Sequence, residues 1–267
     1  MTELQKGIKY AAMALAILLA VSIIGSIVAT VASLVGVFSG DGVADEVTTY
    51  SVSGKVESLE IDIRAAELTI REGETFRVES NLKHLKVKEE DGCLKITEKS
   101  SGGINYYGAV LTVYLPKGAV LEEAYLSTGA GQLTVERLAA EKLSLDLGAG
   151  EVVIRELVAA ESCEINGGAG AVTVEGGALH DLRMEMGVGQ LAMTSALTGD
   201  CEMEMGVGET ELTLLGGKEA YRIRIEKGVG SAEVDGKSAS DGETFGNGAN
   251  RVHIEGGVGS IEVEFES

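Results

Sequence analysis

Residues 143–154 read Leu-Ser-Leu-Asp-Leu-Gly-Ala-Gly-Glu-Val-Val-Ile, and the plan of this stretch recurs along the chain. Apolar and polar residues alternate on both sides of a Gly-x-Gly corner, which is the period-two pattern of half-buried strands. From residue 118 on, the corner begins at positions 129, 148, 168, 187, 206, 228 and 257. This spacing predicts an all-β fold, a β-solenoid (β-helix-like) of about seven to eight coils of 19–22 residues.

Glycine at the corners has a structural explanation. A tight corner requires glycine where φ is positive or where the backbones of successive coils stack closely. Each corner leads into another strand and not into a helix, so a phosphate-binding loop and a nucleotide ligand are excluded. A glycine-free relative, Arg-Ala-Ala, stands at 64–66. The predicted structural corners are Gly129, Gly131, Gly148, Gly150, Gly168, Gly170, Gly187, Gly189, Gly206, Gly208, Gly228, Gly230, Gly257 and Gly259.

Composition narrows the classes of function. The 267 residues carry a formal net charge of -20, and binding to phosphate backbones needs a basic surface, so nucleic acid is excluded as a partner. The three cysteines have neither metal-ligand spacing nor a Cys-x-x-Cys motif, which argues against a disulfide framework or a zinc site. No catalytic motif stands out among the histidines, serines and carboxylates. We therefore expect no enzyme activity and no cofactor.

Residues 11–38 contain no charged side chain and exceed the roughly 20 residues that a helix needs to cross a bilayer. Lys6 and Lys9 precede this segment, and acidic residues follow it. The positive-inside rule then predicts a single-pass anchor at the cell membrane, with residues 1–10 as a short cytoplasmic tail and residues 39–54 as an extracytoplasmic linker. The alternative is a cleaved signal peptide, with Thr-Val-Ala at 30–32 or Gly-Val-Ala at 42–44 as the cleavage site.

Residues 55–267 form the predicted extracytoplasmic β-solenoid domain. Within it, the apolar runs between 74 and 117 predict an antiparallel meander that caps one end, with Asp91-Gly92 as a hairpin turn. Residues 118–267 form the Gly-x-Gly repeat array. Its last interval contains residues 236–250, which we expect to be a surface loop, and the chain ends on a final strand at 260–265.

Alignment of the coils on their corners turns each position into a column of residues. The columns five and three residues before the corner and the column after it are apolar and predict an inward core. Cys163 and Cys201 lie two coils apart in one such column, roughly 9.6 Å at the usual strand spacing, so we expect buried free thiols. Met184, Met193 and Met203 also occupy inward columns, which favours core packing over soft-metal binding.

The column two residues before the corner points outward and is almost uniformly acidic. Stacked like charges repel, so this column would gain from a divalent cation or a basic partner, although solvated carboxylates screened by salt also explain it. The neighbouring column alternates in sign and includes Arg183, Arg224 and His253. The candidate Ca²⁺ ligands are Asp146, Glu185, Glu204, Glu226 and Glu255, within a column that also contains Asp62, Ser127 and Asn166.

The run Val-Tyr-Leu-Pro-Lys-Gly-Ala-Val-Leu-Glu-Glu-Ala-Tyr-Leu-Ser-Thr-Gly-Ala-Gly-Gln-Leu-Thr-Val at 113–135, with the coils that follow it, resembles the bacterial adhesin-type domains of unknown function that are also described as toastrack-like. The likeness covers roughly residues 55–267. It implies a cell-envelope protein without catalytic residues, in a family with some members linked to envelope-stress responses.

Together these features predict a non-enzymatic, membrane-anchored cell-envelope protein that acts as an extracytoplasmic binding or scaffolding module, with a role in envelope stress. Its partners would be the membrane, through residues 11–38, and other envelope membrane proteins. A surface adhesin or structural protein is the alternative. A β-helix enzyme acting on polysaccharide is a more remote one, because the aromatic or basic substrate grooves of such enzymes are missing here.

Overall fold

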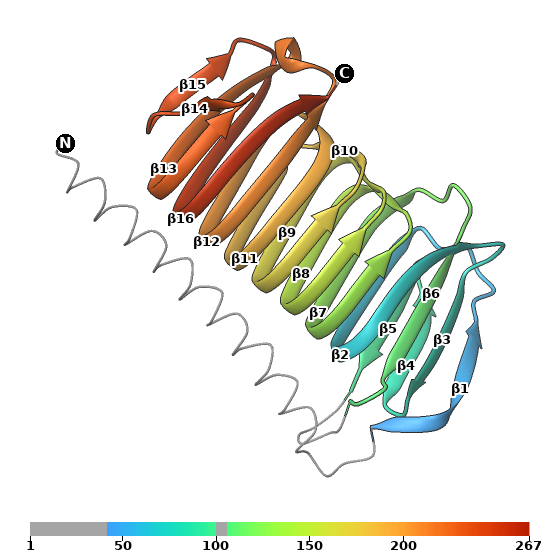
Figure 1. Ribbon diagram of the computed structural model, residues 1–267. Helices are drawn as coiled ribbons and strands as arrows, with labels where there is room; N and C mark the ends of the chain where they lie inside the picture. Colours follow the sequence, from blue (N-terminus) through green and yellow to red (C-terminus); the bar gives the residue numbers. More distant parts are fainter. Residues whose placement is uncertain (1–41, 100–105, 267) are drawn as a thin grey trace.

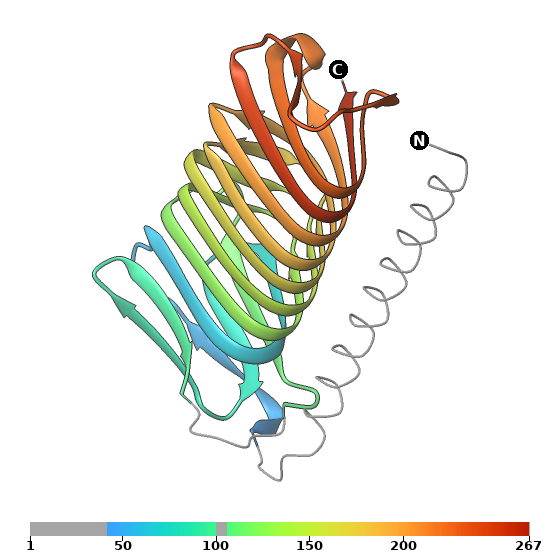
Figure 2. The same ribbon diagram turned by 90° about the vertical axis from the view of Figure 1, so that its left-hand side faces the viewer.

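The computed structural model describes residues 42–99 and 106–266. Their strands form one 16-stranded sheet, which confirms the all-β prediction. Long strands bend back on themselves in the middle and stack side by side in a solenoid-like rack (Figures 1 and 2). These long strands are β2 (Ser58–Gly73), β7 (Leu121–Val135), β8 (Leu138–Ile154), β9 (Leu157–Val174), β11 (Leu182–Thr198), β12 (Asp200–Leu215), β13 (Tyr221–Val234) and β16 (Asn250–Glu266), and the short strand β10 (Gly177–His180) pairs with β9 and β11.

The long strands are parallel and in register at their corners. Gly150 of β8, for example, pairs with Gly131 of β7 and with Gly170 of β9. The same register continues through every neighbouring pair of coils, so the predicted columns are rows of adjacent residues in space. The second glycine of the corner forms the row Gly131, Gly150, Gly170, Gly189, Gly208, Gly259 and Gly230.

Close backbone stacking explains both glycines of each corner. A Cβ atom on Gly148 would lie 1.9 Å from the carbonyl oxygen of Gly129, and one on Gly150 would lie 1.8 Å from that of Gly131. Gly150 also has φ of 151°, whereas Gly148 needs glycine for the close approach alone. The corner of β2 has Ala66 in place of the second glycine, because among the described residues no strand pairs with 63–66 on the outer side of β2, so no stacked backbone excludes a Cβ atom there.

The inward columns form one continuous core. Leu145 and Ile165 are fully buried, as are Met184 and Met203 on the following coils. Cys163 and Cys201 are buried free thiols, separated by Leu182 of the intervening strand, as predicted. The members of the column five residues before the corner are all at most 3 % exposed: Leu59, Ala124, Leu143, Cys163, Leu182, Cys201, Ile223 and Val252.

The C-terminal end differs from the sequence-based expectation. The last strand, β16, lies between β12 and β13, so the final coil of the sequence is the penultimate coil of the stack. The segment predicted as a surface loop contains β14 (Lys237–Ser238) and β15 (Glu243–Gly246), which pair antiparallel with β13. The segment is at the surface, as predicted, but it is not an irregular loop, because the outer edge of β13 would otherwise expose its unpaired backbone groups, and β14 and β15 cover part of that edge.

The N-terminal end is capped by β1 (Val43–Ser51), β3 (Arg77–Leu82), β4 (Leu85–Glu90), β5 (Cys93–Glu98) and β6 (Val110–Pro116). The hairpin at Asp91-Gly92 is confirmed, since β4 and β5 pair antiparallel and both turn residues have positive φ. However, β5 and β6 each pair in parallel with one arm of β2, so the meander prediction is wrong for these two strands. Together, β5 and β6 take the place of one coil of the stack, because each of them pairs with a different arm of β2.

Residues 43–51 were expected to belong to a linker and instead form β1, antiparallel to β3. Most of this strand is exposed, so its sequence lacks the alternation that marks the other strands. Within residues 42–99 and 106–266 no helix has the length and hydropathy to cross a membrane. The predicted membrane segment 11–38 lies outside the described residues.

Candidate binding groove

The acidic column predicted from the sequence is a continuous row on the outward face of the stack. In spatial order, Glu185 pairs with Glu204, Glu204 with Glu255, and Glu255 with Glu226. Asp146 and Asn166 continue the row in the other direction. We call this set the acidic row: Asp62, Ser127, Asp146, Asn166, Glu185, Glu204, Glu255 and Glu226. Its members project from the same face of adjacent parallel strands.

In the N-terminal half of the acidic row, the carboxylate of Asp146 is satisfied by its own neighbours. The hydroxyl of Tyr125 donates to Asp146 Oδ2 at 2.9 Å, and the side-chain amide of Asn166 donates to Asp146 Oδ1 at 2.9 Å. The pKa of Tyr125 is raised, mainly because its hydroxyl donates this hydrogen bond to Asp146. The only carboxylate in this part of the groove is therefore already hydrogen-bonded on both oxygens.

The C-terminal half of the acidic row is different. Glu185 and Glu204 are exposed and directly adjacent on β11 and β12, and within the described part of the chain neither has a hydrogen bond or an ion pair. Glu255 continues the series on β16. Adjacent like charges at strand spacing repel each other, so this half of the row favours a cationic ligand.

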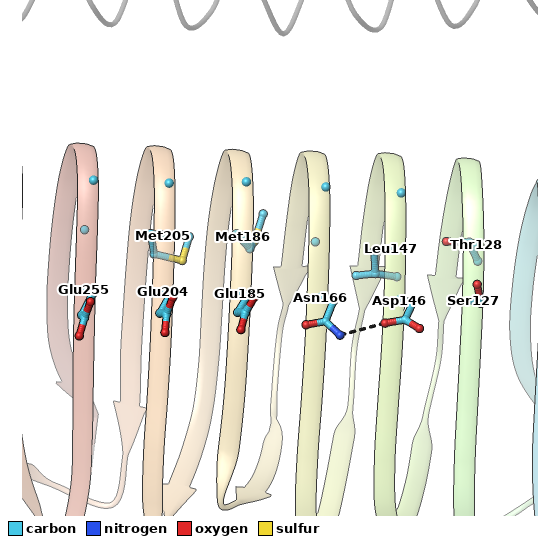
Figure 3. Close-up of a pocket in the computed structure, with 17 residues that line it drawn as sticks. Ser127, Thr128, Asp146, Leu147, Asn166, Glu185, Met186, Glu204, Met205 and Glu255 are labelled. Atoms are coloured by element: carbon cyan, nitrogen blue, oxygen red, sulfur yellow. Dashed lines mark hydrogen bonds between the residues drawn. The ribbon is translucent and has the colours of Figure 1, made fainter.

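A groove of about 830 Å³ runs along the acidic row. Figure 3 shows the carboxylates of Asp146, Glu185, Glu204 and Glu255 in line, with Leu147, Met186 and Met205 nearer to the bend of the strands. We call this depression the acidic groove. The acidic row forms one side of it, and apolar side chains and glycine backbone form the other side. It is lined by Ser127, Thr128, Asp146, Leu147, Gly148, Asn166, Gly167, Gly168, Glu185, Met186, Gly187, Glu204, Met205, Gly206, Glu255, Gly256 and Gly257.

The apolar side of the groove was not predicted. Met184, Met193 and Met203 are buried in the core, as the inward columns indicate. Met186 and Met205 stand one residue before the corner and border the groove, but Met186 is only 5 % exposed and belongs to the same core, and Met205 is partly buried against it. That column contains residues as different as Thr128, Gly167 and Lys227, so it has no periodic signal. The run Met-x-Met before two successive corners was the one available hint.

A second depression, of about 770 Å³, lies on the outward face of β11, β12, β16 and β13 and contains four arginines. Three of them are neutralised locally. Arg183 pairs with Glu202 at 2.9 Å, Arg251 pairs with Asp200, and Arg224 pairs with Glu226 at 2.7 Å. The pair of Arg183 with Glu202 lies within the neighbouring column, as expected, whereas Arg224 and Arg251 pair outside that column. The depression therefore has little net charge to attract an anion.

The acidic row does not form a calcium cage along its length. Calcium takes six to eight oxygen ligands, whereas the row presents one side chain per strand on an open face. Among the described residues, one group of three metal-ligating side chains converges, and it combines Glu226 and Glu255 with His253. The sequence had placed His253 in the adjacent column, and only the insertion of β16 beside β13 brings it to Glu226.

Comparison with solved structures returns bacterial proteins of low sequence identity. A candidate cell adhesion protein from Clostridium sporogenes is 16% identical, with coverage of 83% of this chain and 99% of that chain and a TM-score of 0.36. A candidate adhesin from Bacteroides fragilis is 12% identical, with coverage of 82% and 98% and a TM-score of 0.36. A candidate lipid-binding protein from Parabacteroides distasonis is 12% identical, with coverage of 83% and 96% and a TM-score of 0.42.

A search of curated proteins found no match. The family model Toastrack DUF4097 matches residues 44–263, which begin within β1 and end within β16. This match spans both caps and every coil, and it agrees with the resemblance noted from the sequence. The chain belongs to the Toastrack DUF4097 family.

Proposed function

We propose that this protein is a non-enzymatic binding module of the cell envelope whose acidic groove holds an extended cationic segment of a partner. The observation that carries this proposal is the pair Glu185 and Glu204, which are adjacent, exposed and without a partner in the described structure. A net charge of -20 adds long-range attraction for a basic partner.

The dimensions of the groove suit an extended chain. Four strand-to-strand steps separate Asp146 from Glu255, which is about 19 Å at the usual strand spacing. This is the length of about six extended residues. Lysine or arginine side chains would reach the carboxylates, and their methylene stems would lie against the partly buried Met205. The partner we propose is therefore a basic, extended peptide segment.

A labelled peptide of alternating lysine and glycine tests this proposal directly. We expect the full-length protein to bind it, as measured by fluorescence anisotropy, and we expect Glu185→Gln/Glu204→Gln to weaken binding by roughly 2- to 30-fold, the contribution of two exposed ion pairs. A peptide with glutamate in place of lysine serves as the control. Equal affinity of the protein and its double variant for the lysine peptide would refute the proposal.

The cellular setting is a further part of the proposal. The uncharged segment 11–38 supports a membrane anchor, and in an envelope-stress role this segment would contact a partner helix in the membrane. Replacement of residues 11–38 by an unrelated membrane helix separates this role from that of an adhesin. Loss of the envelope-stress response in this variant supports the partner helix. Retention of the protein's cellular activity supports an adhesin that acts through its outer face.

A further inference from the structure

The end of the acidic row near the C-terminal cap contains a histidine with an unusual environment. His253 and Glu255 are two residues apart on β16 and project from the same face, and Glu226 lies beside Glu255 on β13. His253 Nε2 is 3.6 Å from Glu226 Oε1 and 3.7 Å from Glu255 Oε1. One ligand atom from each of the three residues lies within 4.8 Å of the others.

The imidazole nitrogen lacks a hydrogen-bond partner among the described residues. His253 Nε2 is shielded from solvent although the ring as a whole is partly exposed, and 3.6 Å is too long for a hydrogen bond to either carboxylate. A shielded polar nitrogen without a partner is costly and needs an explanation. This nitrogen faces two carboxylates, so a cation between the three groups satisfies all of them.

We propose that His253, Glu226 and Glu255 bind a divalent transition-metal ion of the Zn²⁺ class. Imidazole nitrogen with two carboxylates is a ligand set that suits Zn²⁺, with a fourth position left for water, and it is a poor set for Ca²⁺, which takes oxygen ligands. Tetrahedral bonds of about 2.0 to 2.1 Å place ligand atoms about 3.4 Å apart. The two observed separations from the imidazole nitrogen need only a small contraction.

The surroundings support the ligand geometry. Arg224 Nε donates a hydrogen bond to Glu226 Oε1 at 2.8 Å, and Arg224 Nη2 forms an ion pair with the same oxygen at 2.7 Å, so this carboxylate is held in its orientation beside His253. The hydrogen bond from Arg224 also lowers the pKa of Glu226. His253 lines the arginine-containing depression and Glu255 lines the acidic groove, so an ion reaches the site from solvent.

An ion at this position would hold β16 to β13, where the chain order and the spatial order differ. The site is independent of the proposed peptide binding, apart from Glu255, which lines both. His253 does not line the acidic groove. A variant of His253 therefore separates the two proposals, because it removes a metal ligand and leaves the wall of the groove intact.

Calorimetric titration of the chelator-treated, full-length protein with Zn²⁺ alone tests the site, with Ca²⁺ as the comparison ion. We expect one Zn²⁺ per chain at this site, a rise in the melting temperature on binding, and a much weaker response to Ca²⁺. His253→Gln should weaken Zn²⁺ binding by at least about 10- to 100-fold, the usual effect of removing even an outer-sphere partner. Glu255→Gln should weaken it as well.

His180→Gln is the matched control, because His180 is a partly buried histidine on β10 whose Nδ1 is hydrogen-bonded to Thr198 at 3.0 Å. It should bind Zn²⁺ as the unmodified protein does. Equal Zn²⁺ affinity of the two histidine variants, or an absence of Zn²⁺ binding, would overturn the proposal. A melting temperature that depends on pH through His253 but not on Zn²⁺ would also overturn it and assign the imidazolium ion as the cation of this cluster. Peptide binding that survives in His253→Gln keeps the two proposals distinct.

Discussion

Leu145 and Asp146 are consecutive residues of β8 that face opposite sides of the sheet. Leu145 is 1 % exposed and packs in a ladder of aliphatic side chains, whereas Asp146 stands in the outward acidic row. Burial of apolar area explains the inward ladder. No comparable gain explains the outward row, because stacked carboxylates repel one another. The inward face therefore accounts for the fold, and the outward face is where a function separate from folding is to be sought.

The largest expected effect comes from the corner that creates the two faces. Gly150→Ala should destabilise the protein by about 2 to 5 kcal/mol, because the new Cβ atom meets the carbonyl oxygen of Gly131 at a residue with φ of 151°. Gly236→Ala is the control, with φ of 68° and nothing within 4 Å of the new atom. Urea denaturation measures both. Equal losses would show that conformation alone, and not coil stacking, requires glycine.

The next effect separates the two faces within one strand. Leu145→Ala should cost about 2 to 5 kcal/mol in the free energy of unfolding, because it opens a cavity in the core. Asp146→Asn should cost less, about 0.5 to 1.5 kcal/mol, because the half-buried side chain exchanges one of the two oxygens that accept from Tyr125 and Asn166 for a donor. A similar loss in both variants would contradict the assignment of one face to the fold.

The cysteines extend the comparison to chemical reactivity. Burial raises the pKa of Cys163 to about 12 and that of Cys201 to about 11, so both thiols stay protonated in the native state. At pH 8 a thiol reagent should modify the half-buried Cys93 in the folded protein and reach Cys163 and Cys201 only after unfolding. Rapid native labelling of all three thiols would contradict the inward placement.

The same shifts predict a pH dependence with a definite sign. A raised folded-state pKa means that the unfolded state releases its thiol protons first, near pH 9, so stability is unaffected below that pH. It should then fall as the pH rises from about 9 towards 11 and 12. In Cys163→Ala/Cys201→Ala this part of the alkaline loss should disappear, as measured by thermal unfolding against pH. An identical alkaline slope in this variant would refute the assignment to these thiols.

The smallest expected effect on stability is on the outward row itself. Glu185→Gln/Glu204→Gln removes two adjacent, exposed charges that have no hydrogen bond or ion pair in the described structure, so the melting temperature should stay the same or rise slightly. A clear loss of stability would mean that these carboxylates support the fold and are not available to a ligand.

The inward face was predictable from the sequence and the ends of the stack were not. Period-two alternation and the recurring Gly-x-Gly corner identify the ladder of Leu145, because burial imposes the same chemistry on every coil. Corner spacing carries no information on spatial order, so the insertion of β16 between β12 and β13 was missed. The apolar residues of β16 fit either neighbour, and the order depends on how residues 235–249 cross and cover the end.

The candidate sites follow the same division. Glu185 and Glu204 were found by counting from the corner, since the register is regular through the middle of the stack. The cluster of His253 with Glu226 could not be found by counting, because it forms only where β16 is inserted beside β13. Met186 was missed because its column has no periodic pattern. Sequence periodicity thus identifies residues that recur in every coil, whereas contacts that occur only once in the chain are visible only in the structure.

The most direct measurement compares two ways of removing the same charge. Glu185→Gln/Glu204→Gln and Glu141→Gln/Glu161→Gln each remove two exposed carboxylates, but Glu141 and Glu161 do not line the acidic groove. We predict that the first variant binds the lysine peptide roughly 2- to 30-fold more weakly than the second at physiological salt. Equal affinities would show that net charge alone attracts the peptide and would contradict a binding site in the groove.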